Sequence, residues 1–415
     1  MLKKVNLILI LAVAFVFLVG CNGVEQTTNS GINVRIIEDF DMQDLDIPPS
    51  VQTNCWRIYG SIEVLNGLTG EVENSIKFDR LGNWCFPQLF GDYYITFERI
   101  LDEYDLDIIL AAELLIFDRA FNLVEKFIMN EDVVSEINFS NQTIGQNEAG
   151  EWLGYMIGSN GEIYSYNFHT YEIIQIAHLG GEKREIYLMP DANKLAFVLT
   201  HELEFIFPEG ILADIEIGVI DLDSHEITMM YEVENMMLSF FPDPVMASID
   251  EFLLVTLTIG GEEQPGKEVF MIHTSTGEIR TIQIREDDFS WRADESYDRW
   301  IFDANTILDE RWLLMQSAEV SSDIYNIWSR SDMTSTIRLY DTQTGNVIFE
   351  HLLIDEDTLD HGETLSARAS VIQLEENIYL IRQSIATGEV TEQLPFPTDV
   401  RFEYIVIEIT VYDDE

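Results

Sequence analysis

One short unit recurs along this chain and constrains its fold more than any other feature. In the clearest copy, a strand of alternating residues at 337–341 runs into a polar turn that ends in Thr344-Gly345, and a second, β-branched strand follows. Further copies occupy residues 217–227 and 269–279, and weaker copies occupy 163–176 and 378–390. A strand, a tight turn and a second strand are the parts of a β-hairpin. The repetition therefore predicts an all-β fold made of successive hairpins.

A second marker alternates with these hairpins. A polar turn that leads into an apolar strand begins at Asp191, Asp250 and Asp309, each 59 residues after the previous one. Two markers that alternate with a period of tens of residues predict repeated four-stranded sheets. Such sheets pack most simply around an axis, as the blades of a β-propeller. We expect five or six blades over residues 141–415, closed by a final strand at 401–412 that joins a blade near Gly145.

The apolar strands of the predicted blades supply their core. Stacked sheets bury both faces of their inner strands. We therefore expect Phe197, Leu254 and Leu314, one from each marked strand, to point between neighbouring blades.

Residues 190–197 resemble a turn of TolB-type propeller repeats. The chain reads Pro-Asp-Ala-Asn-Lys-Leu-Ala-Phe where those repeats read Pro-Asp-Gly-x-x-Leu-Ala-Phe, and Val219-Ile220-Asp221-Leu222 resembles the strand that follows. Ala192 replaces the glycine, and the other copies lack Pro-Asp. The resemblance implies degenerate propeller repeats over about residues 145–395. It also implies one candidate role, that of an envelope-assembly factor of the TolB type.

Residues 53–140 form a different pattern of short strands separated by turn residues. This spacing is typical of a small antiparallel β-sandwich. Gly60, Asp79, Gly82 and the stretch 91–94 resemble the prealbumin-like domains related to carboxypeptidase regulatory regions. That resemblance implies a spacer or binding module without an active site. A chain of 415 residues is long enough for two such folded units.

The first residues have the features of an export signal. Lys3 and Lys4 precede an apolar run at 5–19, which is too short to span a bilayer comfortably. Leu18-Val19-Gly20-Cys21 follows and resembles the lipobox of bacterial lipoproteins. The resemblance implies a signal peptide at 1–20, cleavage before Cys21, and a membrane anchor through a lipid on that thiol. The protein would then be exported and lipid-anchored to the bacterial cell envelope. The alternative is an ordinary signal peptide followed by a chance cysteine.

A polar, acidic stretch at 21–52 is interpreted as a flexible tether. Beyond it, Cys55 and Cys85 are the only other cysteines. Two cysteines in an exported domain predict one disulfide bond. Two buried free thiols are the alternative.

The chain has 23 basic and 75 acidic residues and a formal net charge of −52. This charge repels nucleic acid, which excludes DNA or RNA as a partner. Dispersed carboxylates indicate a solvated surface, a saline habitat or divalent-cation binding. Asp355, Asp357 and Asp360 form the best candidate metal cluster, and calcium is the ion that suits carboxylate ligands. A polar loop between blades explains the same three residues. No other cofactor is predicted.

Recognisable catalytic motifs are missing. The turn at 158–161 is not a nucleophile elbow. His201-Glu202 begins a metalloprotease-like string, but Phe205 stands where the second histidine belongs. The sequence therefore favours a propeller that binds a protein or a glycan, or acts as a scaffold, over an enzyme. The alternative is an extracellular polysaccharide hydrolase or lyase, whose pair of carboxylates no motif reveals.

Overall fold

Strands make up the whole regular structure in the described part of the chain. The computed structural model describes residues 26–27, 32–38, 40–42, 47, 50–56, 59–78, 88–90, 93–101, 109–118, 120, 122–130, 137–147, 149–158, 160–181, 183–206, 210–238, 244–260, 266–285, 304–307, 311–320, 333–354, 363–365, 370–387 and 399–412. These residues form strands β1 to β29 and no helix. The described part of the chain therefore contains no helix that could cross a membrane. Every strand pair is antiparallel, which confirms the predicted all-β class.

Most sheets are meanders of consecutive strands, as a chain of hairpins requires. The first sheet consists of β3 (Ser50–Trp56), β4 (Tyr59–Leu65) and β5 (Val72–Phe78). The second consists of β6 (Gln88–Phe90), β7 (Tyr93–Leu101), β8 (Ile109–Asp118) and β9 (Leu123–Asn130). The third is β10 (Ile137–Gln146), β11 (Trp152–Gly158), β12 (Glu162–Asn167), β13 (Ile173–His178). A later one is β22 (Ala304–Ile307), β23 (Trp312–Val320), β24 (Met333–Asp341), β25 (Asn346–Ile354).

One eight-stranded sheet is two meanders in contact. Its halves are β14 (Lys183–Met189), β15 (Lys194–Ile206), β16 (Gly210–Asp221), β17 (Ile227–Leu238), and β18 (Val245–Ile249), β19 (Phe252–Ile259), β20 (Gly266–His273), β21 (Ile279–Arg285). A single pair, Leu238 with Ile259, joins them. We therefore treat the halves as two four-stranded units.

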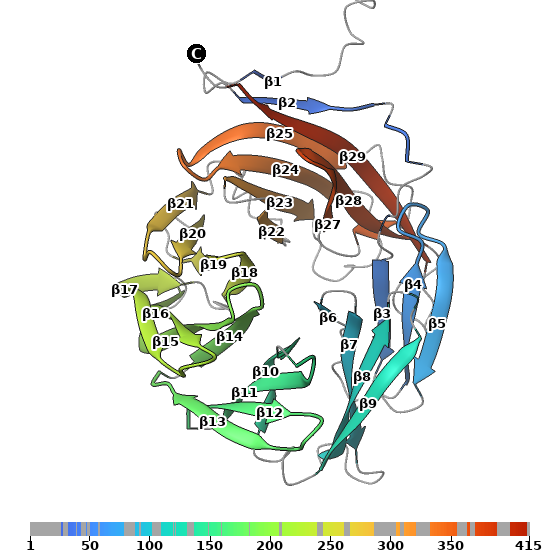
Figure 1. Ribbon diagram of the computed structural model, residues 1–415. Coiled ribbons are helices and arrows are strands. Elements are labelled where there is room, and N and C mark those ends of the chain that lie inside the picture. Colours follow the sequence, from blue (N-terminus) through green and yellow to red (C-terminus); the bar gives the residue numbers. More distant parts are fainter. Residues whose placement is uncertain are drawn as a thin grey trace, which may run out of the picture.

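These sheets stand around a ring (Figure 1). The first strands of successive sheets contact one another, β10 with β14, β14 with β18, and β18 with β22. Contacts between first strands place those strands innermost, which is the arrangement of propeller blades. The described residues thus form a β-propeller, and β3–β5 and β6–β9 stand in the same ring as the later blades (Figure 1).

The core lies between blades. Phe197 packs with residues of β11 to β13 in the preceding blade, whereas Leu254 and Leu314 pack with the blades that follow theirs. All three are buried, so the prediction that they point between blades is confirmed. Phe197 also lies over Gly218, its partner across the ladder, where an added Cβ would come within 2.4 Å of the ring.

The β6–β9 sheet shares its core with the β10–β13 blade. Ile95, Leu114 and Met129 of the first pack with Trp152 and Phe168 of the second. This differs from the separate sandwich expected over residues 53–140. Strand spacing is the same in both architectures, so the sequence pattern did not distinguish a sandwich from two further blades.

The last blade is built from both ends of the described chain. It contains β26 (Thr364–Leu365), β27 (Ser370–Glu375), β28 (Ile378–Thr387) and β29 (Asp399–Val411), with β1 (Gln26–Thr27) and β2 (Ile32–Ile36) added outside β29. β29 pairs with β28 and β2, so its expected pairing near Gly145 is wrong. Residues 32–36, expected within the tether, instead bury Ile32 and Val34 against this blade.

A candidate binding cleft between two blades

The recurring sequence unit folds as a six-residue turn before the last strand of a blade. Its first residue is usually Asn or Asp, whose side chain accepts hydrogen bonds from backbone N–H groups two and three residues later. In one copy, Asp221 Oδ1 accepts from Asp223 N at 3.2 Å and from Ser224 N at 2.8 Å. Asn66 forms the same turn in the β3–β5 sheet, accepting from Leu68 N and Thr69 N at 3.0 Å each.

The fifth residue of this turn has a left-handed backbone. Gly70, Gly277 and Gly345 occupy that position, with φ between 72° and 76°. Tyr171 and His225 occupy it in two neighbouring blades, with φ of 60° and 59°. A side chain in this conformation costs about 1–2 kcal/mol, which glycine avoids. The two blades that bear this cost border a cleft.

That cleft has a volume of about 230 Å³ and lies between the β10–β13 blade and the last turn of the β14–β17 blade. Its lining residues come from three strands and two turns of the first blade and from one turn of the second. They are Asn147, Leu153, Tyr155, Ser165, Asn167, Glu172, Ile174, Ile176, Leu222 and His225. The lining residues of each strand are two apart, as Leu153 and Tyr155 are, because every second side chain of a strand points to the same face of the sheet.

A carboxylate fixes the polar rim. Glu151 Oε2 accepts a hydrogen bond from Asn147 Nδ2 at 3.1 Å and from Asn167 Nδ2 at 2.9 Å. These two bonds, Asn147 first, lower the pKa of Glu151. Each asparagine side chain also accepts a hydrogen bond from a backbone N–H of its own turn, which holds the rim in place.

Tyr155 supplies a phenol hydroxyl to the cleft. The residue is only 6% exposed, and its hydroxyl has no hydrogen-bond partner among the described residues. Burial, helped by the charge of Asp223, raises its pKa to about 12. The phenol is therefore protonated at neutral pH and free to donate or accept one hydrogen bond. Ser165 lies directly opposite Tyr155 on the neighbouring strand.

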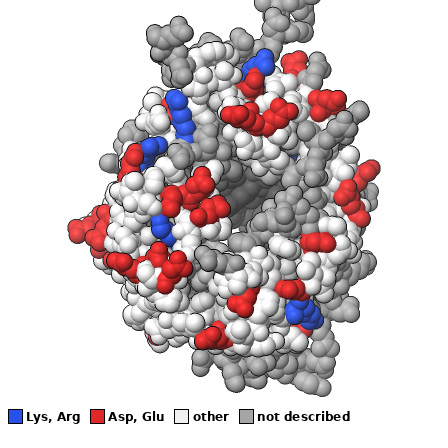
Figure 2. Space-filling model, in the orientation of Figure 1, with Lys and Arg blue, Asp and Glu red and all other residues white. Residues whose placement is uncertain are grey.

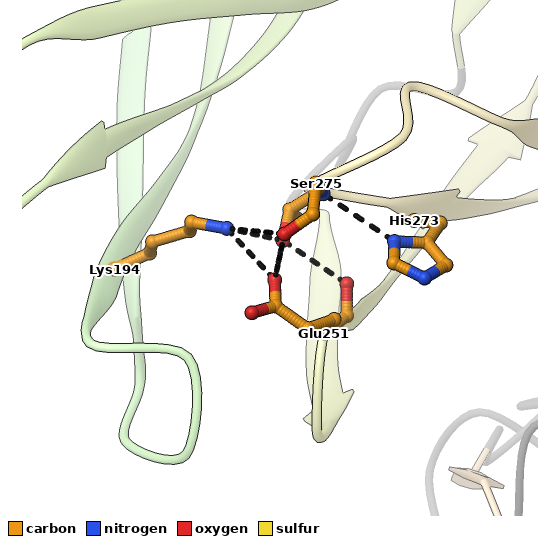
Figure 3. A network of polar contacts seen from close by, with 5 residues as sticks. Lys194, Glu251, His273 and Ser275 are labelled. Atoms are coloured by element: carbon orange, nitrogen blue, oxygen red, sulfur yellow. Dashed lines mark hydrogen bonds and ion pairs between the residues drawn. The ribbon is translucent and has the colours of Figure 1, made fainter.

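A different polar cluster ties the β14–β17 blade to the next one (Figure 3). Lys194 Nζ lies 2.7 Å from Glu251 Oε2, 3.0 Å from Thr274 Oγ1 and 3.2 Å from Ser275 Oγ. The hydrogen bond from Lys194, followed by that from Ser275, lowers the pKa of Glu251 to about 2. Lys194 therefore forms an ion pair that links two neighbouring blades.

The candidate lipidation, disulfide and metal residues predicted from the sequence lie outside the described residues. These are Cys21, Cys85, Asp355, Asp357 and Asp360, and the side chain of Cys55 in β3. The predicted lipidation, disulfide and calcium site therefore stay predictions. His201 lies on β15 with Nε2 3.2 Å from Glu216 Oε1. Within the described ranges, no group of three or more His, Cys, Asp or Glu could hold a metal ion.

Sequence reasoning did not find the cleft. Tyr155 and Ser165 come from strands whose alternation looks like that of the other strands, and Glu172 falls within a weak copy of the recurring unit, at 163–176. One local signal was present, because Tyr171 and His225 replace glycine at the left-handed position of the repeat.

Comparison with known proteins identifies no family for this chain. No protein-family model and no curated protein matches the sequence. Among solved structures, the tricorn protease is 13% identical with a TM-score of 0.44, over 91% of this chain and 38% of the protease. An oligogalacturonate lyase in complex with manganese is 9% identical with a TM-score of 0.38, over 88% of this chain and 97% of the lyase. An uncharacterized protein from Listeria monocytogenes is 11% identical with a TM-score of 0.42, over 81% and 88%. Each of these TM-scores is below 0.5, so we draw no conclusion about this chain from them.

Proposed function

We propose that this protein is an exported bacterial lipoprotein whose propeller is a binding module, held at the membrane by a lipid on Cys21. The observation that carries the binding role is the cleft between the β10–β13 and β14–β17 blades, with the unpartnered hydroxyl of Tyr155 inside it. A ligand that accepts or donates a hydrogen bond at this hydroxyl gains from that bond.

The cleft suits binding better than hydrolysis. Glycoside hydrolysis needs two carboxyl groups about 5–10 Å apart on either side of the scissile bond. Glu172 is the one carboxylate among the residues that line the cleft. The nearby Glu151 is held by Asn147 and Asn167, which lower its pKa and so oppose a role as general acid. The ligand is a protein or a glycan, because the net charge of −52 opposes nucleic acid.

The anchor rests on the lipobox-like sequence at 18–21. The ten residues between Cys21 and β2 span at most about 35 Å when fully extended. An acyl group on Cys21 would therefore hold the propeller close to the membrane, at the last blade. Acyl chains contribute about 0.8 kcal/mol of membrane binding for each buried methylene.

Replacing the lipidated residue tests the anchor. The variant Cys21→Ser should lose labelling by radioactive fatty acid in cells and should either move to the soluble fraction or stay unprocessed. The variants Cys55→Ser and Cys85→Ser should keep the wild-type labelling and fractionation. Unchanged labelling of Cys21→Ser would show that no lipid is attached there.

Ligand-induced stabilisation tests the binding role. The full-length protein should show a higher Tm with a member of a panel of neutral oligosaccharides and of basic, acidic and neutral peptides, because a ligand that binds only the folded state stabilises it. The variant Tyr155→Phe, which keeps the ring and removes the hydroxyl, should show a smaller rise. Turnover of an oligosaccharide that Glu172→Gln abolishes would instead identify an enzyme.

A further inference from the structure

We infer that the cleft binds the cationic side chain of a partner polypeptide, a guanidinium or ammonium group on an aliphatic stem. This inference rests on the binding role proposed above. The cleft offers a carboxylate, an unpartnered hydroxyl and an apolar wall within one space of about 230 Å³. That volume far exceeds the ~15 Å³ that one water needs.

The charge around the cleft favours a cation. Glu172 lines it, and the described lining contains no Lys or Arg. Asp223, on the turn that carries Leu222 and His225, is close enough to act on Tyr155. Glu151 lies behind the two asparagines of the rim. Acidic side chains are also spread over the ring face in Figure 2, where basic ones are few. Such a field attracts cationic groups.

The apolar wall favours a cation with a stem. Leu153, Ile174, Ile176 and Leu222 line the same space as Glu172 and Tyr155. Arg and Lys bury their methylene stems along apolar surface and keep the charged head at polar groups. The hydroxyl of Tyr155 can accept a hydrogen bond from such a head, and Glu172 can pair with it.

The edge of the sheet favours a polypeptide over a free amine. Among the described residues, β13 is the last strand of its sheet, and none of them pairs with its outer backbone groups. Ile173 and Ile174 on this strand are 44% and 45% exposed. An extended peptide added beside β13 would pair with its backbone, and alternate side chains would lie on the face that carries the cleft. Peptide backbone and basic side chain would then be recognised together.

The test uses two labelled peptides and the purified full-length protein in about 150 mM salt, which screens the general acidic surface. One peptide is a hexapeptide of β-branched residues with a single central arginine. The other has neutral, isosteric citrulline at that position. Fluorescence anisotropy should show the arginine peptide binding about tenfold more tightly or better, the ratio expected for a hydrogen bond to a charged group.

Matched variants locate the binding. Glu172→Gln should abolish the preference for arginine, and Tyr155→Phe should weaken binding of the arginine peptide severalfold. Glu71→Gln should leave the preference intact, since Glu71 is exposed, occupies the same turn position in the β3–β5 sheet and carries the same charge. Circular dichroism melting of each variant should match the wild type, which excludes misfolding.

Several outcomes overturn the inference. Equal losses in Glu172→Gln and Glu71→Gln would assign the binding to the general acidic surface. Agmatine, a free guanidinium on an aliphatic stem, competing as tightly as the peptide itself would exclude a polypeptide partner. Displacement of the peptide by a neutral oligosaccharide, dependent on Tyr155, would make the ligand a glycan and leave the proposed binding module standing. If the soluble Cys21→Ser protein binds neither peptide nor oligosaccharide, the proposed binding role is wrong. That result would not contradict the proposed lipidation of Cys21.

Discussion

Glu251 shows how a single turn residue joins two blades, and its titration predicts a pH dependence. Its pKa of about 2 lies below the ordinary value of 4.5, chiefly because Lys194 donates a hydrogen bond to it. A depressed folded-state pKa stabilises the protein above pH 4.5, and the contribution is lost as the pH falls towards 2. The side chain of Glu251 is 40% exposed, so the stabilisation is about 1 kcal/mol at most.

The variant Glu251→Gln should therefore unfold at a lower urea concentration than the wild type at pH 7. The difference in unfolding free energy should shrink between pH 4.5 and pH 2. Glu226→Gln is the control, because the Glu226 carboxylate makes no ion pair in the described part of the chain. A difference that stays constant over this pH range would mean that the ion pair does not cause it.

At the scale of elements, the second strand of each blade carries the core on both faces. Phe197, Leu254 and Leu314 are each at most 2% exposed and pack between sheets. Truncating any of them to alanine should cost about 2–5 kcal/mol, because the surrounding blades cannot collapse into the cavity. Ile227→Ala, on the exposed outer strand β17, should cost less than about 1 kcal/mol. Urea denaturation measures both, and equal costs for inner and outer strands would contradict a core between blades.

At the scale of the whole molecule, β2 closes the ring. It adds to β29 and contacts β25 of the neighbouring blade, and Val34 within it is fully buried. The variant Val34→Asp should lose several kcal/mol of stability, because it buries an unpaired charge. Limited proteolysis should then cut the last blade sooner than in the wild type. Arg35→Ala, which removes only an exposed pairing with Glu408, is the control and should behave like the wild type. Identical proteolysis of both variants would show that β2 does not hold the ring closed.

Part of this architecture could be predicted from the sequence, because the hairpin turns depend on residues that are close together in the chain. Turns such as 221–226 and 341–346 are specified by an Asx side chain, a left-handed position and flanking β-branched residues, all within six residues. The unit at 66–71 (Asn-Gly-Leu-Thr-Gly-Glu) carries the same signals and forms the same turn. Reading it as a copy of the repeat would have extended the propeller towards the N-terminus.

The sequence by itself determined the strands, the hairpin turns and the buried face of each inner strand, because alternation and turn chemistry act over a few residues. Only the tertiary structure decided which sheets are neighbours, which strand closes the ring and where a cleft opens. The contacts that settle these points join distant residues, such as Ile32 with Val411 across the last blade or Tyr155 with the turn at Leu222 and His225. Such pairings depend on how whole sheets pack, and no short stretch of sequence contains that information.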